Sequence, residues 1–74
     1  MTLAELIKSE GRTQEWVRAQ LASKGIERNK SHFNEWCNDH YAPKDEYIYT
    51  AIAEVLGKTV EEIKACFSKF REGQ

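Results

Sequence analysis

The chain has little of what marks several large classes of protein. It holds two cysteines and one proline in 74 residues, and its longest unbroken apolar run is three residues. Two cysteines are too few for a disulfide framework, and such short runs form neither a transmembrane helix nor a signal peptide. We therefore expect a cytoplasmic protein without membrane association, in which Cys37 and Cys66 are reduced, buried thiols.

Patterns that carry catalysis or hold cofactors are also missing. The sequence contains neither a glycine-rich phosphate loop nor a nucleophile with a base at suitable spacing. Cys37 and His40 form a single C-x-x-H pair, whereas a structural zinc site takes four ligands at recognised spacings. The sequence therefore predicts no enzymatic activity, no cofactor and no metal site.

A surplus of positive charge, which most DNA-binding domains carry, is lacking too. Eleven Lys and Arg face twelve Asp and Glu, for a net charge of −1. The charges are unevenly distributed, because residues 12–36 hold five cations and three glutamates, whereas the chain from Asp45 onward is acidic. A locally basic face on a near-neutral domain is compatible with DNA binding.

What the chain does have is helical patterning. Thr2-x-x-Glu5 and Thr59-x-x-Glu62 are typical capping boxes, and Gly11 and Gly57 stand where helices end. The apolar spacing predicts an all-α domain over residues 1–70, with a frayed tail at 71–74. The five expected helices are 2–10, 13–23, 29–37, 44–56 and 60–70.

The same spacing predicts one core and some aromatics outside it. The expected core residues are Leu6, Val17, Leu21, Phe33, Trp36, Ile48, Ile52, Val55, Ile63 and Phe67. Pro43 suits the first turn of the helix expected at 44–56. Helical spacing puts Tyr49 off the core face, and Phe70 lies beyond the compact part of the last helix. Such aromatics can form a dimer or partner surface.

Residues 13–36 form the most informative segment. Thr13-Gln14-Glu15-Trp16-Val17 opens a helix, Gly25-Ile26 makes a turn, and a second short helix begins at Asn29 and ends at Trp36. A helix, a glycine turn and a second helix with polar side chains is an arrangement that places side chains in the DNA major groove.

This order resembles the lambda-repressor-like, or XRE, helix-turn-helix family. The resemblance covers roughly residues 2–67, with threonine-glutamine opening the second helix and tryptophan closing the third. Its other matching positions are Val17, Leu21, Phe33, Pro43, the helix from Ala51 to Leu56, and Val60 to Ile63. The resemblance implies a compact five-helix, Cro-like regulator of transcription, typical of phages and mobile elements, that binds operator DNA, often as a homodimer.

The resemblance also implies which residues contact DNA. The base-reading positions are Lys30, Ser31 and Asn34, with His32 and Asn29 nearby. Lysine, serine and asparagine suit base edges chemically. The expected phosphate contacts are Gln14 and Thr13, which open the second helix, and Lys24, Arg28 and Lys44.

The chain departs from the family between the second and third helices. Arg18 stands where a small residue is usual, and Ala22-Ser23-Lys24 separate Leu21 from Gly25. These departures predict an extra turn of the second helix and a wider connection. Together with the near-neutral charge and Glu35 on the third helix, they favour an alternative function, a protein-interaction module such as a small antirepressor that binds a second regulator.

Overall fold

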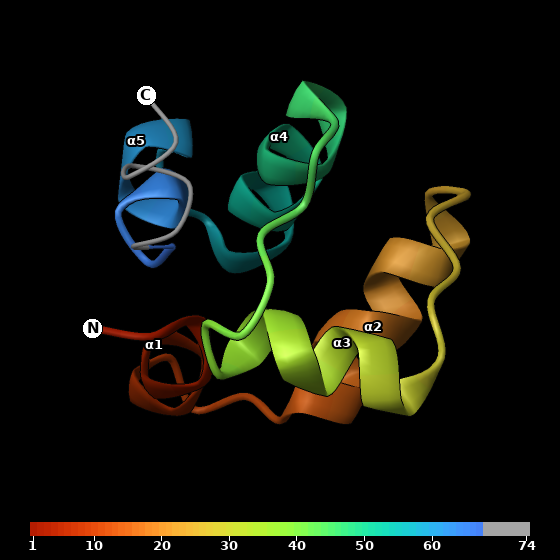
Figure 1. The fold of residues 1–74 in the computed structure, drawn as a ribbon, viewed down its shortest axis with the longest axis horizontal. Coiled ribbons are helices and arrows are strands. Elements are labelled where there is room, and N and C mark those ends of the chain that lie inside the picture. The colour runs from red at the N-terminus through yellow and green to blue at the C-terminus, as the bar shows by residue number, and fades with distance from the viewer. Residues whose placement is uncertain (68–74) are drawn as a thin grey trace.

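The computed structural model describes residues 1–67, and within this range all regular structure is helical (Figure 1). The five helices of the described residues are α1 (Leu3–Ser9), α2 (Gln14–Ser23), α3 (Lys30–Cys37), α4 (Glu46–Leu56) and α5 (Val60–Lys64). The radius of gyration is 11.0 Å, close to the roughly 11 Å expected of a compact domain of this length. The predicted all-α, five-helix architecture is therefore confirmed.

Side-chain caps begin four of the helices, as their sequences predict. At α1 the Thr2 hydroxyl accepts the Glu5 N–H at 3.2 Å and the Glu5 carboxylate accepts the Thr2 N–H at 2.7 Å, a complete capping box. Thr13, Asn29 and Thr59 each accept the backbone N–H three residues further on. These bonds satisfy N–H groups that the first turn of a helix leaves without an intrahelical partner.

The connection between α2 and α3 begins with a Schellman turn. Gly25 adopts φ +87°, Ile26 N–H donates to the Leu21 carbonyl at 2.9 Å, and Gly25 N–H donates to the Ala22 carbonyl at 3.0 Å. The side chain of Ile26 is buried against the core. α2 continues to Ser23 before this turn, which is the end that the sequence predicts for this helix.

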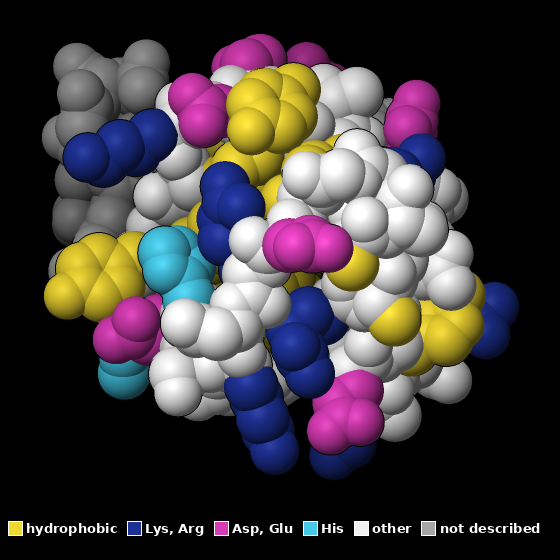
Figure 2. Space-filling model, turned by 90° about the vertical axis from the view of Figure 1, so that its right-hand side faces the viewer, with side chains coloured by type: hydrophobic (Ala, Val, Ile, Leu, Met, Phe, Trp, Pro, Cys, Tyr) yellow, Lys and Arg dark blue, Asp and Glu magenta, His cyan; other side chains and the backbone are white. Residues whose placement is uncertain are grey.

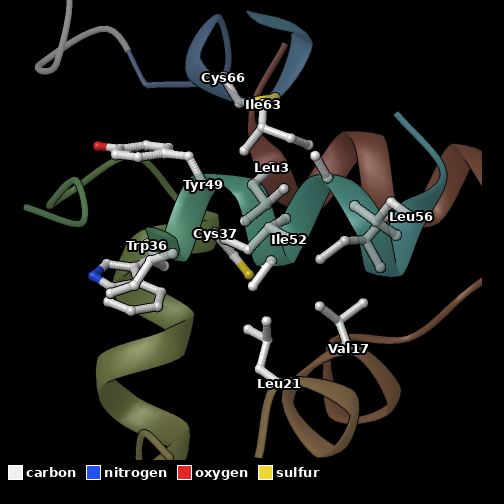
Figure 3. Close-up of a cluster of buried hydrophobic side chains, with 14 of the residues drawn as sticks. Leu3, Val17, Leu21, Trp36, Cys37, Tyr49, Ile52, Leu56, Ile63 and Cys66 are labelled. Atoms are coloured by element: carbon white, nitrogen blue, oxygen red, sulfur yellow. The ribbon is translucent and has the colours of Figure 1, made fainter. Parts of the chain in front are cut away.

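One apolar cluster holds the helices together (Figure 3). α4 contacts both α2 and α5, while α1 and α3 contact α2 and each other. Nine of the ten predicted core residues are buried, and the exception is Val55, which is only partly buried. The cluster also contains residues outside the list of expected core residues: Leu3, Ile7, Ile26, Tyr49, Ala51, Ala53 and Leu56, with Cys37 and Cys66 as the expected buried thiols.

The prediction that Tyr49 lies off the core face is wrong. Its side chain is 1% exposed, its hydroxyl donates to the Pro43 carbonyl, and its ring packs edge-on against Phe67 with 5.6 Å between centroids. Pro43 is therefore not in the first turn of α4, which begins at Glu46, but is buried in the preceding segment. Packing from two other segments makes this second side of α4 interior.

The last helix is shorter than predicted. α5 ends at Lys64, and Cys66 and Phe67 donate to the carbonyls three residues back, Ile63 and Lys64, each at 3.0 Å. Bonds of this spacing tighten the chain, and both side chains turn into the core. The remainder of the predicted helix, Phe70 and the predicted tail at 71–74 lie outside the described residues.

Candidate nucleic-acid interface

The two faces of α3 differ sharply in chemistry. Phe33, Trp36 and Cys37 are buried on one face, at 3% exposure or less. The other face is polar and exposed, and it carries Lys30, Ser31, His32 and Asn34. The structure thus brings four of the five predicted base-reading side chains to the exposed face of α3, within its first five residues.

Asn29, the fifth, has a structural task. Its Oδ1 accepts the His32 N–H at 2.7 Å and so begins α3. The ring of His32 then packs edge-on against Trp36, with 5.0 Å between centroids and planes at 85°. Asn29 therefore fixes the start of the helix, and Trp36 restricts the orientation of His32.

Two of the predicted phosphate contacts lie together beside α3. Arg28 and Lys44 line a groove of about 260 Å³ between α3 and the segment leading to α4. The Arg28 guanidinium lies over the Trp36 ring, 5.7 Å from its centroid, and donates to the Glu27 carbonyl at 2.7 Å. The remaining lining residues are His32, Trp36, Tyr41, Ala42, Pro43, Asp45 and Ile48. The groove therefore combines two cations, Arg28 and Lys44, with one carboxylate, Asp45, and with aromatic rings.

The other predicted phosphate contacts are placed differently. Lys24 forms an ion pair with Glu54 of α4, with 3.1 Å between Nζ and Oε1, so the structure does not bring it to α3. The Thr13 hydroxyl caps α2 by accepting the Trp16 N–H at 3.1 Å. Gln14, the first residue of α2, is partly exposed.

Two exposed residues that were not among the predicted contacts are Tyr41 and Arg12. Tyr41 is 60% exposed and lines the groove with Arg28 and Lys44. The Arg12 guanidinium lies over the ring of Trp16, 4.2 Å from its centroid. The four-residue spacing of Arg12 and Trp16 is a signal that sequence reasoning could have used. The position of Tyr41 follows only from how residues 38–45 run across the domain.

The wider connection leaves a second groove, between α2 and residues 27–29, with a volume of about 550 Å³. Arg18 lines this groove and is partly exposed. The other lining residues are Glu15, Ala19, Ala22, Glu27, Arg28 and Asn29. Two glutamates and two arginines therefore surround a base of small alanine side chains.

Charges of both signs share this side of the molecule. Figure 2 views it from the side of the connection between α2 and α3, and dark-blue Lys and Arg side chains are interspersed there with magenta Asp and Glu side chains. Long-range attraction of a nucleic acid to such a face is weaker than to a uniformly basic one. For the binding of a nucleic acid to this face, direct contacts with individual cations next to α3 would therefore contribute more than the electrostatic field of the whole face.

The cysteines lie apart from this surface. Cys37 and Cys66 are free, buried thiols, and burial raises the pKa of Cys37 from 9.0 to about 12. Burial likewise raises the pKa of Cys66. Within residues 1–67 no group of three or more His, Cys, Asp or Glu side chains is placed to hold a metal ion. In the same residues no helix has the length and apolar character needed to cross a membrane.

No protein-family model matches the chain, and no curated protein or solved structure matches it either.

Proposed function

We propose that the chain is a lambda-repressor-like helix-turn-helix regulator that binds duplex DNA by inserting α3 into the major groove. The observation that carries this proposal is the division of α3 into two faces. Phe33, Trp36 and Cys37 anchor one face in the core, while the exposed face presents Lys30, Ser31 and Asn34. A polar helix held rigidly by its opposite face suits base reading, because its side chains start from fixed positions.

The dimensions and chemistry of α3 agree with this use. An α-helix with its side chains is about 10–12 Å across, so α3 fits the major groove, which is roughly 12 Å wide. Lys30 suits guanine O6 and N7, Asn34 suits adenine N6 and N7, and Ser31 suits either a base or a phosphate. The protein would act by binding alone, through occlusion or recruitment at a promoter.

The groove beside α3 supplies the backbone contacts in this proposal. Arg28 and Lys44 line it together with the exposed Tyr41, so a phosphate entering beside α3 would meet two cations. Phosphate contacts position a protein on DNA and provide most of its non-specific affinity. The carboxylates interspersed among the cations on this side of the molecule reduce the affinity gained from phosphate contacts. We therefore expect base contacts to supply a larger share of the binding free energy.

A protein-interaction module remains the second candidate, and one observation favours it. The larger groove lies between α2 and residues 27–29 rather than on the outer face of α3, and Glu15, Glu27, Arg18 and Arg28 surround it. Mixed charges around small side chains give partner specificity rather than affinity for a polyanion. A small regulator that binds another regulator could use such a groove.

The two functions separate in a binding experiment. The purified protein would select duplexes from a random pool, and fluorescence anisotropy would give the affinity for the selected duplex across salt. Two phosphate contacts per protomer, from Arg28 and Lys44, should lower the affinity about 12-fold between ~50 and ~200 mM salt. Lys30→Ala and Asn34→Ala should each cost ~1–3 kcal/mol at one base position and relax preference there.

Lys64→Gln is the matched control, because Lys64 belongs to α5, which lies at the upper side of Figure 1 away from α3, and its loss should leave DNA affinity unchanged. Selection of no duplex, and no salt-sensitive binding, would refute the DNA proposal. Stoichiometric co-purification with a second regulator, lost on substitution of Arg18 or Glu27, would then support the interaction module.

A further inference from the structure

Arg12 is held at a fixed place between α1 and α2. Its backbone N–H donates to the Ile7 carbonyl at 3.1 Å, and the preceding Gly11 adopts φ +74°, so the Schellman turn that ends α1 sets the Arg12 backbone. The Arg12 guanidinium lies 4.2 Å from the centroid of the Trp16 ring. Both the backbone and the head of this side chain are therefore restrained, although the residue is exposed.

Trp16 is itself a firm support. It lies in the first turn of α2, its N–H donates to the Thr13 hydroxyl at 3.1 Å, and its side chain is partly buried against the core. The cation–π attraction between guanidinium and indole therefore joins two groups that the fold has already placed. Arg12 is restrained before any ligand arrives, which lowers the entropy lost on binding one.

A stacked guanidinium remains able to bind an anion. Its N–H donors lie in the plane of the group and point outward from its edge, whereas the indole covers only one face. Phosphate is the anion that this planar fork matches. Arg28 offers a contrast, because its guanidinium is farther from its tryptophan, at 5.7 Å, and already donates to the Glu27 carbonyl.

The position of Arg12 agrees with a role at the DNA surface. In Figure 1 the chain between α1 and α2 runs along the same lower edge of the molecule at which α2 and α3 begin. A duplex whose major groove receives the start of α3 would pass this edge. We propose that Arg12 is a DNA phosphate contact and that Trp16 is its positioning residue, an inference that rests on the proposed function.

Five variants test the inference on the selected duplex, with affinity measured at several salt concentrations. Arg12→Gln should weaken binding several-fold for all sequences alike and reduce the salt slope by about 0.9, the loss of one phosphate contact. Both Arg12→Lys and Trp16→Leu keep a positive charge at residue 12 but remove the stacking of a guanidinium on the indole ring. Each should therefore weaken binding two- to fivefold, as an order-of-magnitude expectation, while the salt slope stays the same.

The double variant Arg12→Lys/Trp16→Leu separates positioning from a merely structural effect. If Trp16 acts through Arg12, the double variant should bind DNA no more weakly than whichever single variant binds it more weakly. If instead the fold-losses in affinity of the two single variants multiply in the double variant, Trp16 does not position Arg12. Trp16→Phe keeps an aromatic face for the guanidinium and should retain most of the DNA affinity. This variant keeps the test valid if Trp16→Leu destabilises the fold. Circular dichroism melts of every variant provide the folding control.

The outcomes also distinguish this inference from the proposed function. Wild-type protein that binds duplex DNA with a salt slope unchanged by Arg12→Gln would overturn the inference and leave the function standing. Wild-type protein without salt-sensitive duplex binding would overturn both. Lys64→Gln again controls for the loss of one positive charge, because α5 lies at the upper side of Figure 1, away from the edge that holds residues 10–13.

Discussion

Replacing Cys37 by alanine should change the stability of the domain in a direction that reverses with pH. The Cys37 side chain is 0% exposed, and Figure 3 shows it within the apolar cluster, between Ile52 of α4 and Leu21 of α2. Burial raises its pKa from 9.0 to about 12 because a thiolate is poorly solvated there. The unfolded chain therefore releases this proton at a lower pH than the folded chain does.

The sign and the size of the effect follow from that difference. Below the unfolded pKa both states keep the proton, so the stabilising contribution of the neutral thiol is fully present. As pH rises from about 9 towards 12, the free energy of unfolding should fall by about 1.4 kcal/mol per pH unit. Removing the sulfur costs about 0.5–1.5 kcal/mol at neutral pH, as for deletion of one buried heavy atom. The variant should thus be less stable at neutral pH and more stable above about pH 10.

Urea denaturation followed by circular dichroism, with reductant present, measures this from about pH 7 to about pH 11. Burial also raises the pKa of Cys66 and of Tyr49, but both groups occur in the wild type and in the variant, so their contributions cancel in the difference. A wild-type-minus-variant difference that stays constant across this pH range would refute the argument, because it would mean that the Cys37 thiol ionises as readily in the folded chain as in the unfolded one.

Two further substitutions test the packing and the turn that position α3. Trp36 is 3% exposed and contacts Phe33 and His32, so Trp36→Ala should lower the free energy of unfolding by about 3–5 kcal/mol, and a thermal transition close to that of the wild type would contradict this burial. Gly25→Ala should lower the free energy of unfolding by about 1–2 kcal/mol, because φ at this residue is +87°. Crowding is not the reason, since the described residues other than its chain neighbours have no atom within 4 Å of an added Cβ. Gly25→Asn should cost less, and a larger loss for asparagine than for alanine would show that crowding rather than φ decides.

Features of the fold that depend on neighbouring residues were predictable from the sequence. The Thr2, Thr13 and Thr59 caps need only a hydroxyl and an N–H three residues on. The i, i+3 pair Phe33 and Trp36 likewise identifies the inner face of α3 without knowledge of what covers it. Local hydrogen bonding and helical periodicity therefore account for the existence, order and approximate ends of α1 to α4.

Features that depend on distant segments could not be predicted in this way. Tyr49 is interior because Pro43 and Phe67 reach it from two other parts of the chain, and periodicity within α4 contains no information about either. α5 ends at Lys64, and in the tight turn that follows it Cys66 and Phe67 are buried in the core formed with distant segments. Both errors arise because tertiary packing overrides local propensity.

In the candidate site, too, features set by neighbouring residues were predictable and features set by distant segments were not. Sequence reasoning selected Lys30, Ser31 and Asn34 through the resemblance, from their positions relative to Trp36, and the structure places them on the exposed face of α3. It could not foresee that Lys24 pairs with Glu54 thirty positions away, nor that Tyr41 lies beside Arg28. Which cations stand next to α3 is set by the paths of the connecting segments, and those paths depend on the assembled core.

The wide connection between α2 and α3 does not make the position of α3 loose. The Schellman turn at Gly25 fixes its first residues, burial of Ile26 ties its middle to the core, and the Asn29 cap fixes its end. Phe33 and Trp36 then set the rotation of α3 about its own axis, because both are 3% exposed or less. The connection borders the groove of about 550 Å³ beside α2. It leaves α3 with one buried face, one polar face and a fixed starting point, which is what the proposed DNA contacts require.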